Sequence, residues 1–488
     1  MVLAVFALLA APALAQNNLA RLALAEERRA AYNALARSLL KELIEINTTE
    51  SSGSVTAAAE AMAAHLRAAG YRADDIRILG ANDRKKNLVA RLRGTGQMRP
   101  VLILGHLDVV EARRSDWSTD PFKLVEKDGY LYGRGVVDMK SGDAIMTAAM
   151  IRLRRENFRP PRDIILALTA DEESGDANGV SWLLKNHREL LDAQFVINHD
   201  GTSILADHGQ PQYYELDETE KVYADYQLIA TDPGGHSSLP RPDNAIYTLT
   251  AALDRLAQYE FPFELNAVTR RYYEALLRLE SADKQADIRA ILHTPPEREA
   301  LARLMKDPLE YAITHTTCTP TRLDAGHANN ALPQRAVAII NCRILPGHGA
   351  EEVRQDIIRA ANDRRLTINF VADDGTVLPA APQKYTRPAG KPDESVLAPL
   401  RTLVHAYWPG LRIVPSMAVG ASDAIFTEAA GLPTYTVTGI MIDRDDDRSH
   451  GRDERLPVRS FERGSEFFYD YLQLIAAPDS AARSKPSR

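Results

Sequence analysis

Three carboxylates stand in a row at Asp171, Glu172 and Glu173, inside the stretch TADEESG (169–175). They follow the apolar run DIILAL (163–168), which has the composition of a buried strand. Adjacent negative charges repel one another, and this repulsion raises the pKa of at least one of them. One interpretation is an acidic turn on the surface. The other is that one or more cations bind among these side chains.

Other residues that can bind metals occur elsewhere in the chain, some of them at the ends of apolar runs. His106 and Asp108 end the run VLILGHLDVV, and at a spacing of two on a strand they share a face. Asp138 follows a glycine-containing stretch, Asp200 ends FVINHDG, and His450 lies in the polar segment DRSHGRDERL. Each is weak evidence alone, because polar residues at strand ends are common. Together, several oxygen donors and two imidazoles suit a pair of divalent metal ions, with zinc preferred.

The segments that carry these residues alternate between expected strands and helices. We expect strands at 86–94, 100–110, 162–170 and 193–201, and helices at 24–45, 55–69, 141–157 (capped by Ser141) and 179–187. This order indicates an α/β fold with a doubly wound, mostly parallel sheet and helices on both faces. In such sheets ligands bind beyond the carboxyl ends of the strands, where the candidate residues fall.

A second module is expected inside the first. From residue 218 the sequence changes to an alternating strand, a turn-rich segment, helices and further strands, which indicates an inserted α+β module at 218–379. The larger domain then consists of 16–217 and 380–478, followed by a disordered tail at 479–488. Within this scheme 265–310 is a charged helical surface insertion, and the proline-rich 378–395 is a linker.

The first residues have the pattern of an export signal. MVLAVFALLAAPALAQ is apolar and closes on Ala13-Leu14-Ala15, a small-x-small peptidase site, although a preceding basic region is missing. We therefore expect a signal peptide at 1–15 and a periplasmic or secreted protein, with a buried helix as the alternative. No later stretch resembles a membrane span. A net charge of −7 over 488 residues argues against nucleic acid as a partner.

The two cysteines are placed so that they can form a disulfide. Cys318 and Cys342 are equidistant from Asn330, the centre of an expected two-stranded hairpin, so they would face each other across the ladder. In an oxidising compartment this placement permits a bond. Two inert core thiols are the alternative.

The chain resembles the zinc-dependent metallopeptidase family of acetylornithine deacetylase, succinyl-diaminopimelate desuccinylase, aminoacylase and glutamate carboxypeptidase. Five motifs occur in the family's order, from about residue 25 to 475: GHLDVV, GRGVVDMKSG, TADEESG, NHDG and HGRDERLPV. In the inserted module, PGGHSS, AGHANNALP and NCRILPG are similar to the family's lid or dimerisation domain. With the helical insertion, they most resemble the carboxypeptidase S branch.

The resemblance implies a ligand set for two Zn²⁺ ions, for which Co²⁺ or Mn²⁺ could substitute. His106 and Asp200 would hold one ion, Glu173 and His450 would hold the other, and Asp138 would bridge them. The bond after Asp138 corresponds to one that is often cis in the family.

The resemblance also implies catalytic roles. Asp108 would support His106, as carboxylates beside a metal ligand do. Glu172 would be the general base, taking a proton from a zinc-bridged water and passing it to the leaving amine, while the resulting hydroxide attacks the amide. His236 would stabilise the oxyanion from the second subunit of a homodimer.

Four further residues match substrate-binding positions of the family. Asn330 and Arg343 would bind the substrate's carboxylate, and Gly420 and Ser422 lie in VGASDA, which matches a substrate-contacting loop. For His236, Asn330 and Arg343 the alternatives are a turn histidine, a hairpin-turn residue and a surface ion pair.

The sequence therefore predicts an exported dizinc enzyme that hydrolyses the C-terminal amide of short peptides or of N-acyl amino acids. Asp200 departs from the pattern, since many carboxypeptidase and acylase members have Glu there and Asp is commoner in the family's aminopeptidases and dipeptidases. Such an aminopeptidase or dipeptidase is the alternative. A catalytically silent metal-binding protein would require loss of the base or of ligands, and none is missing. A serine or cysteine hydrolase is disfavoured, because there is no nucleophile elbow.

Overall fold

The computed structural model describes residues 10–173, 177–372, 375–382 and 393–477. Most of the predicted signal peptide, most of the predicted linker and the predicted disordered tail lie outside these ranges. The chain divides into two compact units. Unit 1 comprises residues 1–169, 199–210 and 438–488, and unit 2 comprises residues 170–198 and 211–437. The domain boundaries expected from the sequence stay a prediction.

Unit 1 contains four neighbouring strands in the order β1-β2-β6-β3. Strands β3 and β6 are parallel, with His106 opposite Thr169, whereas β1–β2 and β2–β6 are antiparallel. Both β3 and β6 are buried along their whole length, which explains their nearly continuous Val, Ile, Leu and Ala composition. The strands of unit 1 are β1 (Ile76–Gly80), β2 (Lys86–Leu92), β3 (Val101–His106), β4 (Val125–Lys127), β5 (Tyr130–Tyr132), β6 (Ile164–Thr169), β8 (Ile204–Asp207), β19 (Met441–Asp443) and β20 (Arg455–Pro457).

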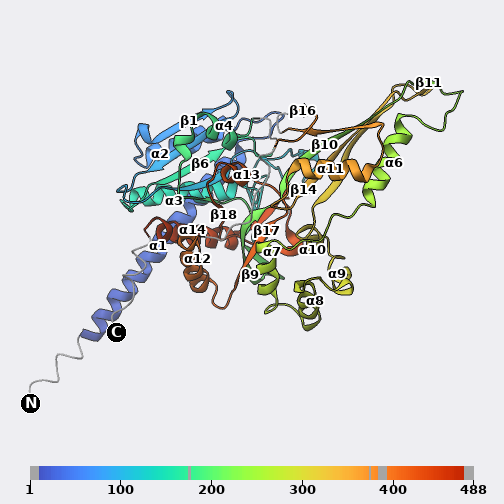
Figure 1. The fold of residues 1–488 in the computed structure, drawn as a ribbon. Coiled ribbons are helices and arrows are strands. Elements are labelled where there is room, and N and C mark those ends of the chain that lie inside the picture. Colours follow the sequence, from blue (N-terminus) through green and yellow to red (C-terminus); the bar gives the residue numbers. More distant parts are fainter. Residues whose placement is uncertain (1–9, 174–176, 373–374, 383–392, 478–488) are drawn as a thin grey trace, which may run out of the picture. The chain divides into compact units, whose positions relative to one another are not determined.

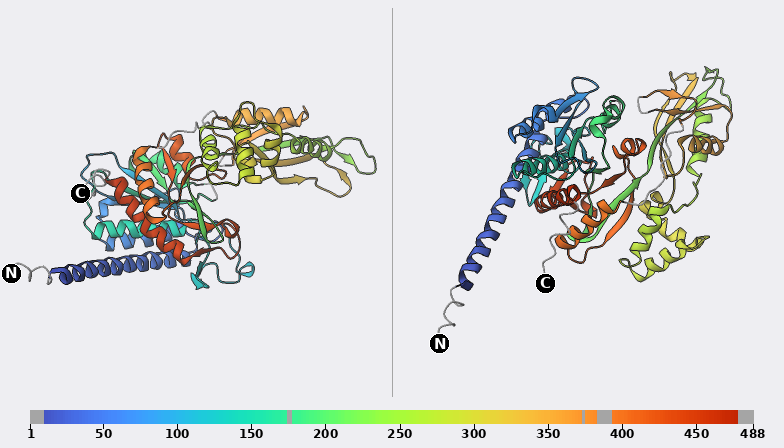
Figure 2. Two further views of the ribbon diagram at one scale, coloured as in Figure 1. Left: turned by 90° about the horizontal axis from the view of Figure 1, so that it is seen from below. Right: turned by 60° about the vertical axis from the view of Figure 1, so that its left-hand side comes forward.

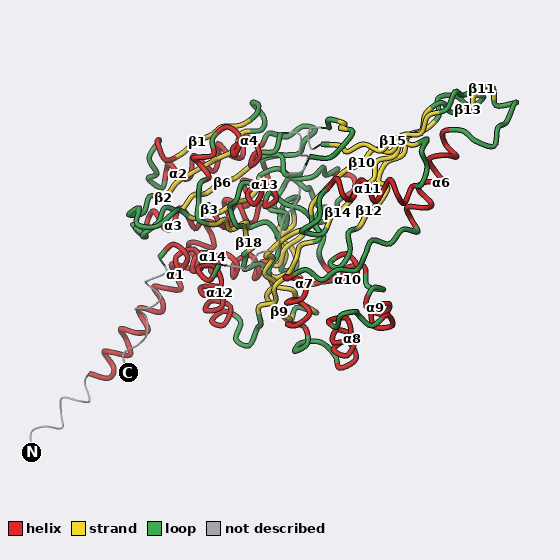
Figure 3. The backbone as a smooth tube through the Cα atoms, viewed as in Figure 1, coloured by secondary structure: helices red, strands yellow, loops and turns green. Residues whose placement is uncertain are grey.

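Helices of unit 1 pack on these strands and on one another. The helices are α1 (Ala10–Glu45), α2 (Val55–Ala68), α3 (Lys140–Arg155) and α14 (Val458–Ala476). Helix α1 is one long element (Figure 2), and α2 and α3 lie alongside the strands of the sheet (Figure 3). Ser141 does not cap α3, because the helix begins at Lys140 and Met139 occupies the N-cap position. None of the helices in the described ranges meets the length and apolarity needed to cross a membrane.

Unit 2 also combines parallel strands with helices. Strand β18 pairs with β7 and β17 with β9, both in parallel, so the predicted α/β class is confirmed. The helices of unit 2 are α4 (Gly179–Asn186), α5 (Arg188–Leu191), α6 (Ala245–Ala257), α7 (Ala267–Leu276), α8 (Ala282–Leu292), α9 (Arg298–Leu304), α10 (Pro308–Ala312), α11 (Ala350–Ala361), α12 (Glu394–Tyr407) and α13 (Ala424–Ala429). Its strands are β7 (Phe195–Asn198), β9 (Gln210–Glu220), β10 (Val222–Thr231), β11 (Gly235–His236), β12 (Thr317–Ala325), β13 (Ala331–Leu332), β14 (Arg335–Ile344), β15 (Leu366–Val371), β16 (Val377–Leu378), β17 (Ile413–Ala418) and β18 (Thr434–Thr436).

The expected α+β module is a five-stranded antiparallel sheet in the order β12-β14-β10-β15-β16. Helices α6 and α11 cover one face (Figure 1). The core on that face is built from alternate strand residues, such as Tyr226, Leu228 and Ile340, packed against Leu249 and Ile357 of the two helices. The charged stretch 265–310 is helical, as predicted, and forms α7 to α10.

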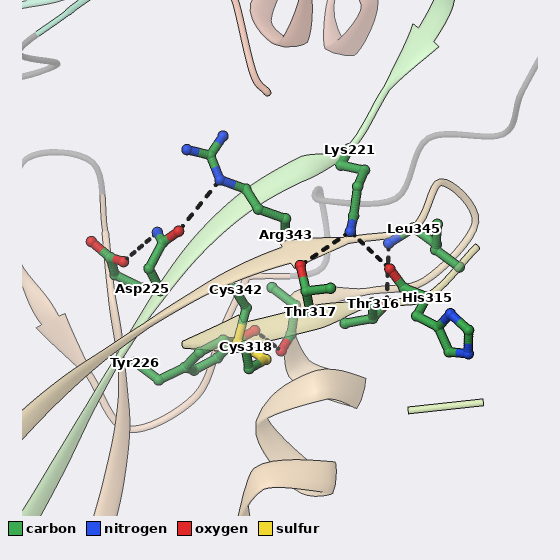
Figure 4. The surroundings of a disulfide bond; sticks show 12 residues. Lys221, Asp225, Tyr226, His315, Thr316, Thr317, Cys318, Cys342, Arg343 and Leu345 are labelled. Atoms are coloured by element: carbon green, nitrogen blue, oxygen red, sulfur yellow. Dashed lines mark hydrogen bonds between the residues drawn. A yellow bond between two sulfur atoms is a disulfide. The ribbon is translucent and has the colours of Figure 1, made fainter. Parts of the chain in front are cut away.

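The predicted cysteine pairing is confirmed. Cys318 of β12 lies opposite Cys342 of β14, and their sulfur atoms form a disulfide with the Cα atoms 4.1 Å apart (Figure 4). The connection between the strands is longer than a tight turn at Asn330, since β12 ends at Ala325 and β14 begins at Arg335. Symmetric spacing was sufficient to predict this pair because an antiparallel ladder places residues equidistant from its loop in register.

Replacing both cysteines by serine should lower the free energy of unfolding by about 3 kcal/mol, because the bond closes a loop with a sequence separation of 24. Denaturant titration of C318S/C342S beside the wild type measures this difference. Alkylation of the native protein without reduction should leave both cysteines unmodified in a peptide mass spectrum. Two alkylated cysteines in that spectrum would show that the bond does not form.

Candidate metal centre

Four of the predicted ligands converge in unit 1. His106 is the last residue of β3, and Asp138 lies in the loop before α3. Asp200 lies just before β8, and His450 lies in the loop before β20. The ligand atoms of His106, Asp138 and Asp200 all lie within 4.8 Å of one another. The Nε2 atom of His450 is 2.9 Å from the second oxygen of Asp138. Asp138 thus presents one oxygen to each histidine, as a carboxylate between two ions does.

Hydrogen bonding to the backbone sets the tautomer of His106. Its Nδ1 atom lies 3.1 Å from the carbonyl oxygen of Asp108, and a carbonyl oxygen only accepts, so Nδ1 carries the hydrogen. In a neutral ring Nε2 is then an acceptor, yet it faces Asp138 Oδ1 at 3.1 Å and Asp200 Oδ1 at 3.9 Å. Acceptors at these distances require a proton or a cation between them. The donor set therefore fits a divalent ion held by imidazole and carboxylate groups.

Asp138 is held in its charged form. Burial acts to raise its pKa, but the hydrogen bonds and the charges of His106 and His450 outweigh burial and hold the pKa well below its usual value. The peptide bond between Asp138 and Met139 is cis, as the family resemblance implied.

Asp108 supports His106 through its backbone more closely than through its side chain. Its carboxylate oxygen is 3.7 Å from Nδ1, whereas its carbonyl oxygen is at hydrogen-bond distance. The expectation that both residues lie on one strand was wrong, because β3 ends at His106 and Asp108 belongs to the following loop.

One buried carboxylate that the sequence analysis missed orders the loop around Asp138. Glu454 is fully buried, and its oxygens accept hydrogen bonds from the backbone N–H groups of Gly135, Val137 and Asp138 at 2.7–3.1 Å. Its fourth partner is the guanidinium of Arg134, at 2.7 Å. Burial raises the pKa of Glu454, but all four partners are donors, so the group acts as an ionised acceptor.

Arg134 connects the same carboxylate to the loop of the second histidine. Its Nη2 atom donates to the carbonyl oxygens of Gly451, at 2.9 Å, and His450, at 3.4 Å. The guanidinium also lies 5.0 Å from the ring of Trp117. The Arg134–Glu454 ion pair therefore positions both Asp138 and His450. The only sequence signal for it was a pair of opposite charges beside two predicted ligands.

Two further polar side chains near these ligands are buried without a hydrogen-bond partner in the described residues. They are Asp143, on the first turn of α3, and His199, which precedes Asp200. Burial raises the pKa of Asp143 well above its usual value and lowers that of His199 to about 4. The ring of His199 is buried and lies 4.5 Å from that of Phe468. Burying either polar group without a hydrogen-bond partner costs folding free energy.

The row of carboxylates that follows β6 is divided by burial. Asp171 is buried, has a φ of 65°, and accepts a hydrogen bond from the backbone N–H of Ala177, as a structural residue would. Glu172 and Glu173 are half-buried in the turn that follows. These residues belong to unit 2, and their roles as base and ligand stay predictions.

The residues predicted to bind the substrate's oxyanion and carboxylate lie on the five-stranded sheet and its extension. His236 is exposed on the two-residue strand β11, opposite Ala331 of β13, and its Nδ1 atom accepts from the Ser238 hydroxyl at 2.7 Å. Asn330 is exposed in the turn before β13. Arg343, on β14, is half-buried, and its guanidinium lies 4.8 Å from the ring of Tyr223.

The loop that contains Gly420 and Ser422 is held by hydrogen bonds of the Ser422 hydroxyl to β9, to β7 and within the loop. The Ser422 hydroxyl donates to Glu220 at 2.8 Å and accepts from the side chain of Asn198 and the backbone of Ala424, each at 3.2 Å. These three bonds use the hydroxyl's one donor and two acceptor positions. A substrate contact in this loop would therefore involve the backbone, and Gly420 leaves open space there.

A family model described as peptidase family M20/M25/M40 matches residues 102–474, a range that includes every predicted site residue. The chain belongs to this family. Its members are metal-dependent hydrolases, so the converging histidines and carboxylates are in keeping with it.

Similar proteins agree with the family. Human N-fatty-acyl-amino acid synthase/hydrolase PM20D1 is 29% identical over 388 residues, which cover 77% of this chain and 74% of that protein. A probable carboxypeptidase S-like 2 from Dictyostelium discoideum is 26% identical over 415 residues, covering 79% and 74%. The structure of human carnosine dipeptidase 1 shares the fold with a TM-score of 0.65 at 16% identity, over 92% of this chain and 98% of that one.

Glu454→Gln should lower the free energy of unfolding by about 3–5 kcal/mol and reduce metal content, because it leaves Arg134 buried without a charge partner. Denaturant unfolding and elemental analysis of the purified protein measure the two effects. The matched control is Glu126→Gln, which removes an exposed ion pair with Arg37 and should cost less than about 1 kcal/mol. Equal losses in the two variants would mean that the buried pair does not organise the centre.

Asp143→Asn should stabilise the metal-free protein at neutral pH by on the order of 2 kcal/mol. An acid whose pKa is raised on folding costs stability above its unfolded pKa of about 4 and costs nothing below it, where it is protonated in both states. The variant and the wild type should therefore match near pH 3–4 and diverge as the pH rises. Thermal unfolding in chelator across this range measures the difference, and parallel curves would contradict it.

Proposed function

We propose that this chain is an exported dizinc hydrolase that cleaves the C-terminal amide of short peptides or of N-acyl amino acids. The observation that carries the proposal is the arrangement of Asp138, which presents one oxygen to His106 and the other to His450, with Asp200 beside His106. The names of the relatives point the same way, since one acts on N-fatty-acyl amino acids and another is a carboxypeptidase S-like protein.

In this proposal His106 and Asp200 would hold one ion, Glu173 and His450 would hold the other, and Asp138 would be a ligand to both. When bound, the ions polarise the amide carbonyl and make a water molecule acidic enough to attack near neutral pH. The chain's own task is to move the proton. Glu172 takes it from the water and delivers it to the leaving amine.

Chain connectivity supports the role given to the two glutamates. Thr169 is in register with His106 on neighbouring parallel strands, and Glu172 is three residues further along the chain. Three extended residues span at most about 11 Å, so the Cα atom of Glu172 lies within that distance of Thr169. The chain therefore keeps Glu172 near the end of β6, which is the end that lies beside His106.

The substrate's free carboxylate is assigned to Arg343, with Asn330, and the oxyanion to His236 from a second copy of the chain. A guanidinium binds a carboxylate through two parallel hydrogen bonds, which selects substrates with a free carboxyl end. Asp200 favours a second candidate function, a dipeptidase or aminopeptidase, because the family's members of that kind commonly have Asp at this position.

Export is proposed from the apolar run that ends at Ala13-Leu14-Ala15, and the Cys318–Cys342 bond supports it, because disulfides persist in oxidising compartments. The enzyme would then be recovered from periplasm or medium without residues 1–15. Recovery only from the cytosol with those residues retained would contradict export.

The assay that tests the function compares three forms of one substrate: an N-acetyl amino acid, its carboxamide, and a free-amine dipeptide. The zinc-loaded enzyme should hydrolyse the N-acetyl amino acid, and its carboxamide should lose about 10- to 100-fold in kcat/KM, because a charge-assisted pair is lost. Turnover of the free-amine dipeptide alone would favour the dipeptidase, and turnover of none across a panel of side chains would refute the proposal.

Glu172→Ala is the control for the mechanism. It should keep close to the wild-type zinc content and lose about 10²- to 10⁴-fold in kcat, because it removes the proton carrier and no ligand. An unchanged rate would refute this role, and a loss of zinc would identify Glu172 as a ligand.

A further inference from the structure

The five-stranded sheet carries an ordered polar ladder on the face opposite its core. Residues alternate between faces along a strand, so Tyr226 and Cys342 are buried in the core while their sequence neighbours point the other way. On that other face Tyr223 lies opposite Arg343, and Asp225 lies opposite Asn341. These four side chains, two from β10 and two from β14, form the ladder.

Hydrogen bonds run through the ladder and end on the guanidinium. Asp225 accepts from the Tyr223 hydroxyl and from the Asn341 amide, each at 2.8 Å. With its NH₂ group turned to Asp225, Asn341 presents its oxygen to Arg343, whose Nε donates to it at 3.3 Å. Figure 4 shows the two hydrogen bonds that lead from Asp225 to Arg343 as dashed lines.

The ladder fixes the orientation of Arg343 without neutralising it. Asp225 is separated from the guanidinium by the Asn341 amide, and the two terminal nitrogens of Arg343 have no hydrogen-bond or ion-pair partner in the described ranges of the chain. Burial and the hydrogen bond to Asp225 raise the pKa of Tyr223 to about 12, so its hydroxyl keeps the proton that it donates.

A second basic side chain, Lys221, interacts electrostatically with Arg343 and has no ion-pair partner among the described residues. Lys221 is buried and donates to the carbonyl oxygens of Ala312 and His315, at 2.9 and 2.7 Å, and to the Thr317 hydroxyl at 3.2 Å. Burial and the charge of Arg343 lower the pKa of Lys221 to about 7. An anion that pairs with Arg343 would therefore also relieve the repulsion between the two cations.

We propose that Asp225, Asn341 and Tyr223 are positioning residues that hold Arg343 as a two-pronged receptor for the substrate's carboxylate. The inference rests on the proposed function for the identity of the anion. The ladder restrains Nε, which leaves both terminal nitrogens available to donate in parallel to a carboxylate. Asp225 determines the arrangement because its charge decides which way the Asn341 amide is turned.

The decisive variant is Asp225→Asn. It removes the charge that orients Asn341, so the amide can turn its NH₂ group toward Arg343 and repel the guanidinium. For N-acetyl-L-leucine KM should rise about 10-fold with kcat within about 2-fold, while kcat/KM for N-acetyl-L-leucinamide stays unchanged. The carboxylate-to-carboxamide preference should therefore fall about 10-fold.

Two matched variants separate orientation from general damage to the sheet. Tyr223→Phe keeps the ring beside Arg343 and removes only the hydroxyl, so the preference should fall by about 3-fold. Gln227→Ala changes the next residue on the same face of β10 and should leave the preference as in the wild type. Equal changes for both substrates in Asp225→Asn, or the same change in Gln227→Ala, would overturn the positioning role.

A measurement without turnover distinguishes failure of this inference from failure of the proposed function. Modification of Arg343 by phenylglyoxal, followed by peptide mass spectrometry, should be slowed by N-acetyl-L-leucine in the wild type but not by its carboxamide, and Asp225→Asn should need about 10-fold more N-acetyl-L-leucine for the same protection. If the wild type is inactive yet protected, the hydrolase assignment fails and the receptor stands. If the wild type is active and Asp225→Asn keeps full protection and preference, the inference fails alone.

Discussion

The buried ion pair of Arg134 and Glu454 is the constraint on which the centre in unit 1 depends. The Glu454 carboxylate accepts from three N–H groups of one loop and from Arg134, and Arg134 in turn donates to the carbonyl oxygens of His450 and Gly451. A buried charge is stable only when all of its hydrogen-bond and ion-pair partners are present. The loop of Asp138 and the loop of His450 must therefore keep one relative geometry for the Arg134–Glu454 pair to form. Asp138 and His450 are brought together by that requirement.

The remaining supports of the centre come from regular structure. His106 ends a fully buried strand, and Lys140, at the first position of α3, donates from its buried amine to the carbonyl oxygens of Leu43 and Ile46 near the end of α1. This burial lowers the pKa of Lys140 to about 7. Together with Asp143 and His199, which have no hydrogen-bond partner in the described part of the chain, such groups make the surroundings of the candidate ligands polar where a more stable core would be apolar.

The two faces of the five-stranded sheet differ in polarity, and the strand alternation places core and polar residues next to each other in the sequence. The disulfide joins β12 to β14 on the core face at Cys342, and the next residue, Arg343, lies on the polar face. Cross-linking the strand at one position limits how far its neighbour can move. The Arg343 guanidinium is restrained by Asn341 on the same strand, and Asn341 is restrained by Asp225 on the adjacent strand. Binding of an anion would therefore cost little conformational entropy of the Arg343 side chain.

Much of the ligand set followed from the sequence alone. His106, Asp138, Asp200 and His450 were candidates by residue type, and the family resemblance implied their roles as ligands, whereas symmetric spacing predicted the cysteine pair. Some strands were missed. Residues 210–220, QPQYYELDETE, were not expected to form β9, since they are too acidic to stand out as a strand, and the three-residue strands β4, β5 and β20 are too short to show a period.

The sequence by itself determined what local periodicity encodes: the α/β class, the helical insertion, the register that pairs Cys318 with Cys342, and the identity of the candidate ligands. Only the tertiary structure decided which groups hold those ligands in place. Glu454 bonds to Asp138 across 316 residues, and Asn341 bonds to Asp225 across 116. The physical reason is that a periodic pattern depends on neighbours a few residues away, whereas the partner of a buried charge depends on which distant segments pack together.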